Sequence, residues 1–298
     1  MDGFRHWEEH GKNAARRFLV DADLILSDLE FHHLFDYDVS MSESNVQRIF
    51  LMEALPKRLQ ACFLKWAHLP PSTTIIRAPC SQPHISYIKL TYNAANICEK
   101  QLATKIANTL STVMGPNRIG IIFCPSHIKA DELGDHFTQG CVSHSQLPDK
   151  KKTDNEAEWK AGKKQWIAAT AGLVLSTNSP MVGAVIFLGV ECGMNFLYQG
   201  AGQSGRNGER SWVVVLQDEH NLNQSAMSHD GLRFDDGDPQ CLVESQAWLQ
   251  ADECRRLGFT KLYDNAMVSC TDLPTAHFCD FCQPDSDIVV KLKALIVN

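Results

Sequence analysis

Four cysteines near the end of the chain have the spacing of a metal site. Cys254, Cys270, Cys279 and Cys282 are separated by 15, 8 and 2 residues. Zinc in structural sites takes four tetrahedral thiolate or imidazole ligands at about 2.3 Å for sulfur, and a C-x-x-C pair supplies two of them on one tight turn. These four cysteines therefore predict a structural Zn²⁺ site.

Two other interpretations of the closing C-x-x-C remain open. It could be a thioredoxin-like redox pair, or the cysteines could be unliganded thiols. A redox C-x-x-C opens a helix within its own strand-helix unit, whereas Cys279 and Cys282 lie in a loop-rich segment. His277 could also replace one cysteine as a ligand.

A second stretch with chemical potential is the glycine-rich segment from Gln199 to Gly208. It lies between two β-branched apolar runs, 184–188 and 212–216, which are typical of buried parallel strands. A polar turn between such strands is a common place for ligand chemistry. The segment also contains G-x-G-x-x-G, but that motif cradles a dinucleotide only when it leaves a strand directly and opens a helix. About ten residues precede it here and a strand follows it, so this interpretation is disfavoured.

The elements around these stretches predict an α/β fold. Apolar strands alternate with helices from residue 87 onwards, which predicts a parallel sheet covered by helices on both faces. The predicted strands of this sheet are 87–91, 119–124, 140–144, 165–170, 184–188 and 212–216. The predicted helices are 95–113, 126–137, 155–161 and 241–257. Upstream, two more strands at 18–26 and 48–52 and a helix at 57–66 are expected.

The pattern predicts several segments in chain order. They are a first-lobe remnant at 1–66, a Pro-rich linker at 67–86, a second lobe at 87–240, a cysteine-rich subdomain at 241–284 and a tail at 285–298.

Composition narrows the functional classes. A hydrophobic content of 44% fits a globular protein with a core. A net charge of −7 disfavours a protein that binds nucleic acid over its whole surface. The densest basic region, Lys150–Lys152 with Lys160, Lys163 and Lys164, is interpreted as a solvated loop.

No apolar run is long enough to span a membrane, and the N-terminus lacks the apolar core of a signal peptide. An intracellular protein without membrane partners is expected.

Six segments, in order, resemble the motifs of RecQ-type superfamily 2 DNA helicases. The resemblance covers about residues 10 to 284. The segments are V-D-A-D-L at 20–24, M-E-A-L-P at 52–56, G-I-I-F-C-P-S at 120–126, W-I-A-A-T-A-G-L at 166–173, Q-G-A-G-Q-S-G-R at 199–206 and C-R-R at 254–256 with the three later cysteines.

The resemblance implies a fold and a set of roles. The fold would be the RecA-like C-terminal lobe of a P-loop NTPase helicase, followed by a small helical Cys₄ zinc subdomain. The family activity would be ATP- and Mg²⁺-dependent 3′–5′ unwinding of DNA, either single-stranded or at a duplex junction, in the nucleus. Gln199 and Arg206 would contact nucleotide, and Ser126, Thr170 and Gly172 would contact the nucleic acid.

Departures from the family pattern bear on activity. No G-x-x-x-x-G-K-[ST] phosphate loop occurs in the chain, which starts after the place where the family has it. In the acidic box Asp21 is followed by Ala22 instead of glutamate, and Gln203 replaces the first arginine of the arginine motif. An arginine facing a transferring phosphoryl group contributes about 10³–10⁵ in rate.

No catalytic residue is therefore intact, and we expect a degenerate, truncated helicase that neither hydrolyses ATP nor unwinds DNA by itself. The alternative is a non-catalytic module derived from a helicase that binds nucleic acid or a protein.

Overall fold

The computed structural model describes residues 16–19, 47–53, 55–136, 140–190, 193–220 and 239–297. They belong to two compact units, divided between Arg77 and Ala78. The acidic box at 20–24, with Asp21 and Ala22, lies outside the described residues.

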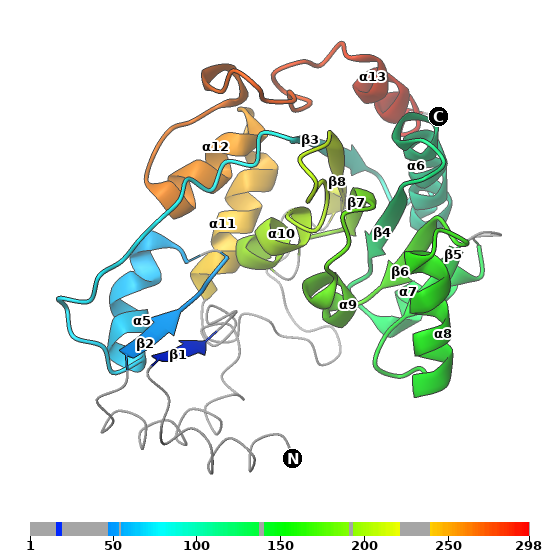
Figure 1. The fold of residues 1–298 in the computed structure, drawn as a ribbon. Helices are drawn as coiled ribbons and strands as arrows, with labels where there is room; N and C mark the ends of the chain where they lie inside the picture. Colours follow the sequence, from blue (N-terminus) through cyan, green and yellow to red (C-terminus); the bar gives the residue numbers. More distant parts are fainter. Residues whose placement is uncertain are drawn as a thin grey trace. The chain divides into compact units, whose positions relative to one another are not determined.

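The larger unit is built on a parallel six-stranded sheet (Figure 1). The strand order is β3-β8-β7-β4-β6-β5. The strands are β3 (Ile85–Tyr92), β4 (Ile119–Phe123), β5 (Gly140–Ser143), β6 (Trp166–Ala169), β7 (Val182–Leu188) and β8 (Ser211–Asp218). Every residue of β4, β6 and β7 is buried, as expected of strands covered on both faces. The predicted α/β fold is confirmed.

Helices cover both faces of this sheet. They are α6 (Glu99–Met114), α7 (His127–Gly134), α8 (Asp149–Lys160), α9 (Ala171–Ser176), α10 (Gly193–Ala201), α11 (Pro239–Gln250), α12 (Arg255–Phe259) and α13 (Asp287–Ala294). On one face α6, α7 and α13 share a core cluster with the strands. On the other, Phe196 of α10 packs against Phe123, and Phe259 of α12 packs against Tyr87. The sheet is thus enclosed between two helical layers.

Two of the predicted helices differ from those in the structure. The predicted helix 241–257 is two helices, because α11 ends at Gln250 and the Trp248 indole donates to the Arg255 carbonyl at 2.8 Å across the break. Helix α8 starts at Asp149, so the basic run Lys150–Lys152 lies in a first helical turn and not in a loop. The Pro148 N-cap, with a φ of −54° that its ring restricts, and the acidic Asp149 in the first turn favour a start at this point.

The segment expected to be a tail contains α13. Ile288, Val289 and Leu292 of this helix are buried in the same core cluster as Ile88 and Leu110. The last described helix therefore belongs to the core of the larger unit.

The smaller unit contains a parallel pair of strands, β1 (Arg16–Leu19) and β2 (Gln47–Phe50). A 3₁₀ turn, Lys57–Leu59, leads into α5 (Gln60–Trp66). Phe50 and Phe63 meet edge to face with ring centroids 5.4 Å apart. Arg48 donates to the carbonyls of Ala67 and His68, which ties the strand to the end of α5. Among the described residues, none of the helices has the length and apolar character needed to cross a membrane.

Candidate functional site

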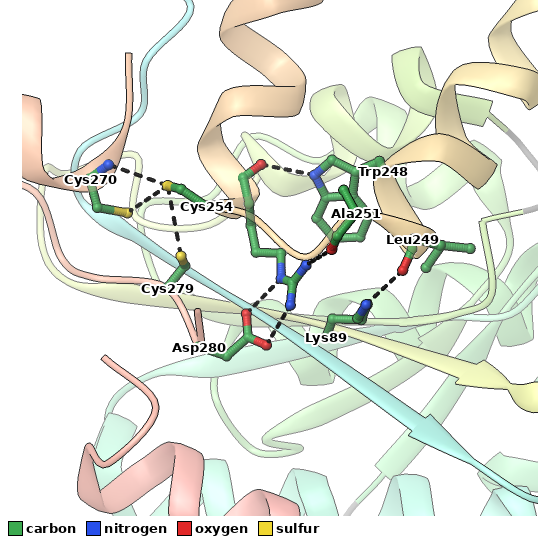
Figure 2. A network of polar contacts seen from close by, with 9 residues as sticks. Lys89, Trp248, Leu249, Ala251, Cys254, Cys270, Cys279 and Asp280 are labelled. Carbon is green, nitrogen blue, oxygen red and sulfur yellow. Dashed lines mark hydrogen bonds and ion pairs between the residues drawn. The ribbon is translucent and has the colours of Figure 1, made fainter. Parts of the chain in front are cut away.

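The four cysteines converge at one point of the larger unit, and Figure 2 shows three of them, Cys254, Cys270 and Cys279. Cys254 is the N-cap of α12, Cys270 begins a 3₁₀ turn, and Cys279 and Cys282 lie in the loop before α13. Their sulfur atoms all lie within 4.8 Å of one another. The Cys254 sulfur is 3.5 Å from that of Cys270 and 3.9 Å from that of Cys279. This donor set can hold a metal ion. Cys254 was expected in the last turn of a helix and instead precedes one.

The thiols of the cluster shift one another's pKa. Hydrogen bonds from the Cys270 and Cys279 thiols lower the pKa of Cys254. The same contact with Cys254 raises the pKa of Cys270, and burial raises the pKa of Cys282 to about 12. Several thiolates so close together are stable only beside a positive charge, and a divalent cation supplies it.

A buried ion pair joins the two halves of the cysteine cluster. Arg255, next to Cys254, donates to both carboxylate oxygens of Asp280, next to Cys279, at 2.9 and 3.2 Å (Figure 2). Both side chains are about 95% buried. Arg255 also donates to the Ala251 carbonyl at 2.6 Å, and Lys89 of β3 donates to the Leu249 carbonyl at 2.6 Å. Both bonds satisfy carbonyls at the end of α11.

Arg256 attaches the cluster to the sheet. Its guanidinium donates to the carbonyls of Gln82, Ile85 and His277 at 2.7, 3.0 and 3.2 Å and lies over the Tyr87 ring. The sequence analysis noted Arg255 and Arg256 only as part of the C-R-R motif. The structure shows that they tie the cysteine-bearing segments to each other and to β3.

The glycine-rich segment is partly helical and not wholly a turn. Gln199 lies in the last turn of α10, which occupies the space between β7 and this segment. Gly200 lies in that helix against Phe187, where a Cβ would come within 2.7 Å of the ring. The first glycine of G-x-G-x-x-G therefore ends a helix instead of leaving a strand, and β8 follows the motif. A dinucleotide cradle is excluded at this place.

Arg206 is bound within its own lobe. One terminal nitrogen donates to the Asn178 side-chain oxygen at 3.0 Å, and the other donates to the Gln203 side-chain oxygen at 2.8 Å. Gln203 is 1% exposed and donates to the Gln199 carbonyl at 3.3 Å. The contact between Arg206 and Asn178 was not predicted from the sequence. This corner of the lobe is a neutral amide network around one arginine.

Three predicted nucleic-acid contacts gather at the carboxyl edge of the sheet. Ser126 follows β4 and caps α7, accepting from the Lys129 N–H at 3.3 Å. Thr170 follows β6, the neighbour of β4, and caps α9, in which Gly172 is the second residue. The Thr170 N–H donates to the carbonyl of Ser143, the last residue of β5. Open α/β sheets bind ligands at this edge.

Sequence comparisons connect the chain to helicases. No family model matches it. ATP-dependent DNA helicase Q5 of Mus musculus is 24% identical over 251 residues, covering 76% of this chain and 24% of that protein; the Rattus norvegicus protein is also 24% identical. A putative ATP-dependent RNA helicase, R290 of Acanthamoeba polyphaga mimivirus, is 22% identical over 207 residues. The chain spans about a quarter of the length of the Q5 relatives.

Structural comparisons agree on the fold. Dbp5 of S. cerevisiae, bound to RNA and ADP BeF3, matches with a TM-score of 0.57 at 13% identity, over 93% of this chain and 62% of that one. Mss116p, bound to ssRNA and AMP-PNP, matches with a TM-score of 0.57 at 16% identity, over 73% and 47%. The sheet and its helices thus have the RecA-like fold of helicase lobes, and together with the Q5 similarity this confirms the RecQ-type helicase resemblance that the motifs predict.

Proposed function

We propose that this chain is a helicase-derived module that binds nucleic acid and does not hydrolyse ATP or unwind DNA by itself. The observation that carries the proposal is the state of Arg206. Its two terminal nitrogens are engaged by Asn178 and Gln203 of the same lobe. Where the resemblance places a second arginine, the buried carboxamide of Gln203 carries no charge.

The sequence supports the same conclusion. Phosphoryl transfer depends on positioning and on positive charge around the γ-phosphate. The 298 residues contain no G-x-x-x-x-G-K-[ST] segment to cradle the phosphates, and Ala22 stands where the resemblance has a glutamate to polarise water. Loss of one arginine alone removes about 10³–10⁵ in rate.

The test is an ATPase assay of the whole chain with and without single-stranded DNA. We expect no DNA-stimulated turnover above background, and an Arg206→Ala variant with the same background rate. A DNA-stimulated rate that Arg206→Ala abolishes would contradict the proposal.

Nucleic-acid binding is supported by the helicase relatives and by the position of Ser126, Thr170 and Gly172 at one sheet edge. We propose that this edge contacts the sugar-phosphate backbone. Binding to a fluorescent single strand should weaken steeply with salt, since released counterions drive such binding. If a folded sample does not bind the strand at low salt, the nucleic-acid proposal is wrong, and the alternative of a protein-binding module remains.

We also propose that the metal of the cysteine cluster is a structural zinc ion. Four converging sulfurs are the ligand set that zinc takes in structural sites. Elemental analysis should find one zinc per chain. A Cys279→Ser variant should lose that zinc and the protease resistance of residues 254–282, because binding energy at such a site is folding energy. A zinc-free, folded chain with a reducible Cys279–Cys282 disulfide would favour the redox interpretation instead.

Two finer expectations belong to the same proposal. The nuclear location follows from the helicase resemblance, and a fluorescent fusion of the chain tests it. The division into a lobe remnant, a linker, a second lobe and a zinc subdomain is tested by limited proteolysis, which should cut first between residues 67 and 86.

A further inference from the structure

We propose that the Arg256 guanidinium is the counter-charge of the four-cysteine cluster and holds a metal ion there more tightly than the sulfur ligands alone would. This inference rests on the structural zinc ion proposed above and assigns Arg256 a role toward it. A divalent ion neutralises about two of the four thiolate charges of such a site, so the cluster would keep about two negative charges. A buried group with that charge is stable only beside a cation.

Arg256 is a buried cation without an ionic partner of its own. Its side chain is 1% exposed. Its terminal nitrogens donate to the carbonyls of Gln82, Ile85 and His277, and its Nε has no hydrogen-bond partner in the described part of the chain. Its guanidinium carbon lies 5.6 Å from the centroid of the Tyr87 ring. Carbonyls and an aromatic face carry no net charge, so this cation still needs a negative group nearby.

Two carboxylates of the same region are directed elsewhere. Both oxygens of Asp280 accept from the Arg255 guanidinium, at 2.9 and 3.2 Å. Both oxygens of Asp264 accept from the Cys80 N–H, at 3.2 and 3.0 Å. Within the described residues, no carboxylate oxygen lies within 4.0 Å of an Arg256 nitrogen, whereas Arg255 has such a partner. The sulfur cluster is thus the negative group that lacks a cation of its own.

The chain places Arg256 beside the cysteines. It is the second residue after Cys254, and its acceptor His277 is the second residue before Cys279. Contact with Cys254 is the main influence on the pKa of Cys270 and raises it, whereas the Arg256 charge acts in the opposite direction. The guanidinium therefore favours the thiolate, which is the form of cysteine that binds a metal ion.

A purely structural role would use the same contacts, because the three carbonyl bonds alone tie the cysteine-bearing segments to β3. Two substitutions separate charge from bonding. Arg256→Gln keeps an amide donor and removes the charge, whereas Arg256→Lys keeps the charge and loses the planar fork of the guanidinium. Lys261→Gln is the control, because it removes an equal charge from the half-exposed pair of Lys261 with Glu253.

The first measurement is the zinc affinity of the full chain, determined by competition with a chelator. Arg256→Gln should bind zinc about 10–100-fold more weakly, which is the usual effect of losing a group that supports metal ligands. Arg256→Lys should recover most of that loss. Lys261→Gln should bind zinc as tightly as the unchanged chain, because its charge is screened by solvent.

The second measurement uses Co²⁺ in place of zinc and records the charge-transfer absorption of the thiolate-bound ion. This transition moves an electron from sulfur to the metal, so a cation beside the sulfur raises its energy. The band of Arg256→Gln should therefore shift to longer wavelength, and the band of Arg256→Lys should not. A role confined to holding the segments together would weaken binding without moving the band.

The proposal is overturned if Arg256→Gln binds zinc as tightly as the unchanged chain, if the Gln and Lys variants weaken binding equally, or if the Co²⁺ band of Arg256→Gln stays in place. Should Arg256→Gln not fold, Arg256→Lys decides: it must bind zinc and keep the Co²⁺ band of the unchanged chain, and loss of either overturns the proposal. If the unchanged chain itself binds neither metal, the proposed zinc site is wrong instead.

Discussion

The cysteine cluster and the glycine-rich segment around Arg206 contain the same kind of group, an arginine held by side-chain oxygens, in opposite environments. Arg255 pairs with the carboxylate of Asp280 and both are buried. Arg206 is exposed and is bound by the neutral amides of Asn178 and Gln203. The first region brings together four thiols that could hold a metal ion, and the second has the neutral carboxamide of Gln203 beside its arginine.

Under the proposed function, the fold depends on these two regions to different degrees. A structural metal site contributes to folding, so its ligands and the Arg255–Asp280 pair matter whether or not the protein turns over a substrate. Gln203, by contrast, bonds to Gln199 at the end of α10 and to Arg206 in the loop. Substitutions should therefore damage the two regions to very different degrees.

The largest effect is expected at Asp280. Asp280→Asn leaves the Arg255 guanidinium buried without a counter-charge, which costs about 3–5 kcal/mol. Urea unfolding measures it. The control is Lys261→Gln, which removes the half-exposed Lys261–Glu253 pair and should cost about 0–1 kcal/mol. Equal losses in the two variants would mean that burial does not distinguish these pairs.

A smaller effect is expected at Gly205. Its φ is +67°, and a Cβ would meet the His84 ring at 2.5 Å and the Ser211 hydroxyl at 2.7 Å. Gly205→Ala should cost about 1–3 kcal/mol. Gly208→Ala, in the same loop with φ +80° and open space around it, should show the backbone strain without the clash. If Gly208→Ala were the more damaging change, the packing explanation would be wrong.

The smallest effect concerns pH and compares the two regions directly. Burial lowers the pKa of His84, beside the glycine-rich loop, and of His277, in the cysteine-bearing segment. A lowered histidine pKa means that the unfolded chain takes up the proton first, so stability is full above about pH 6.5 and falls as the pH drops below it. His84→Gln and His277→Gln should each flatten the loss of Tm between pH 6.5 and 5. His84→Gln should act more, because His84 is the more buried of the two.

The sequence predicts the sheet well because its strands are continuous apolar runs, such as Ile119–Phe123. It misses α10, because Gly193 and Gly200 stand within its nine residues and glycine disfavours a helix. It places the start of α8 too late, because three lysines before Thr153 hide the helical pattern. These are cases in which tertiary packing, and not local periodicity, decides the element.

For the candidate sites, a different factor limits what the sequence can predict. Spacing is enough to select the four cysteines, because a tetrahedral metal site would impose one geometry on its ligands. Arg256 instead bonds to three backbone carbonyls, from residues 82, 85 and 277. Every residue has a carbonyl, so no pattern in the sequence marks these acceptors. The same holds for Asn178, which meets Arg206 only after the chain has folded.

The position of β3 has a consequence for synthesis of the protein. Its sheet neighbour is β8, with Ile85 opposite Ser211, and α13 adds Ile288 and Leu292 to the core around Ile88. Ribosomes add about 5–20 residues per second, so β3 waits on the order of ten seconds for its partner strand. During that interval an apolar strand is open to association with other chains. Chaperone engagement on the nascent chain should therefore peak before residue 211 emerges and end only after α13 has docked.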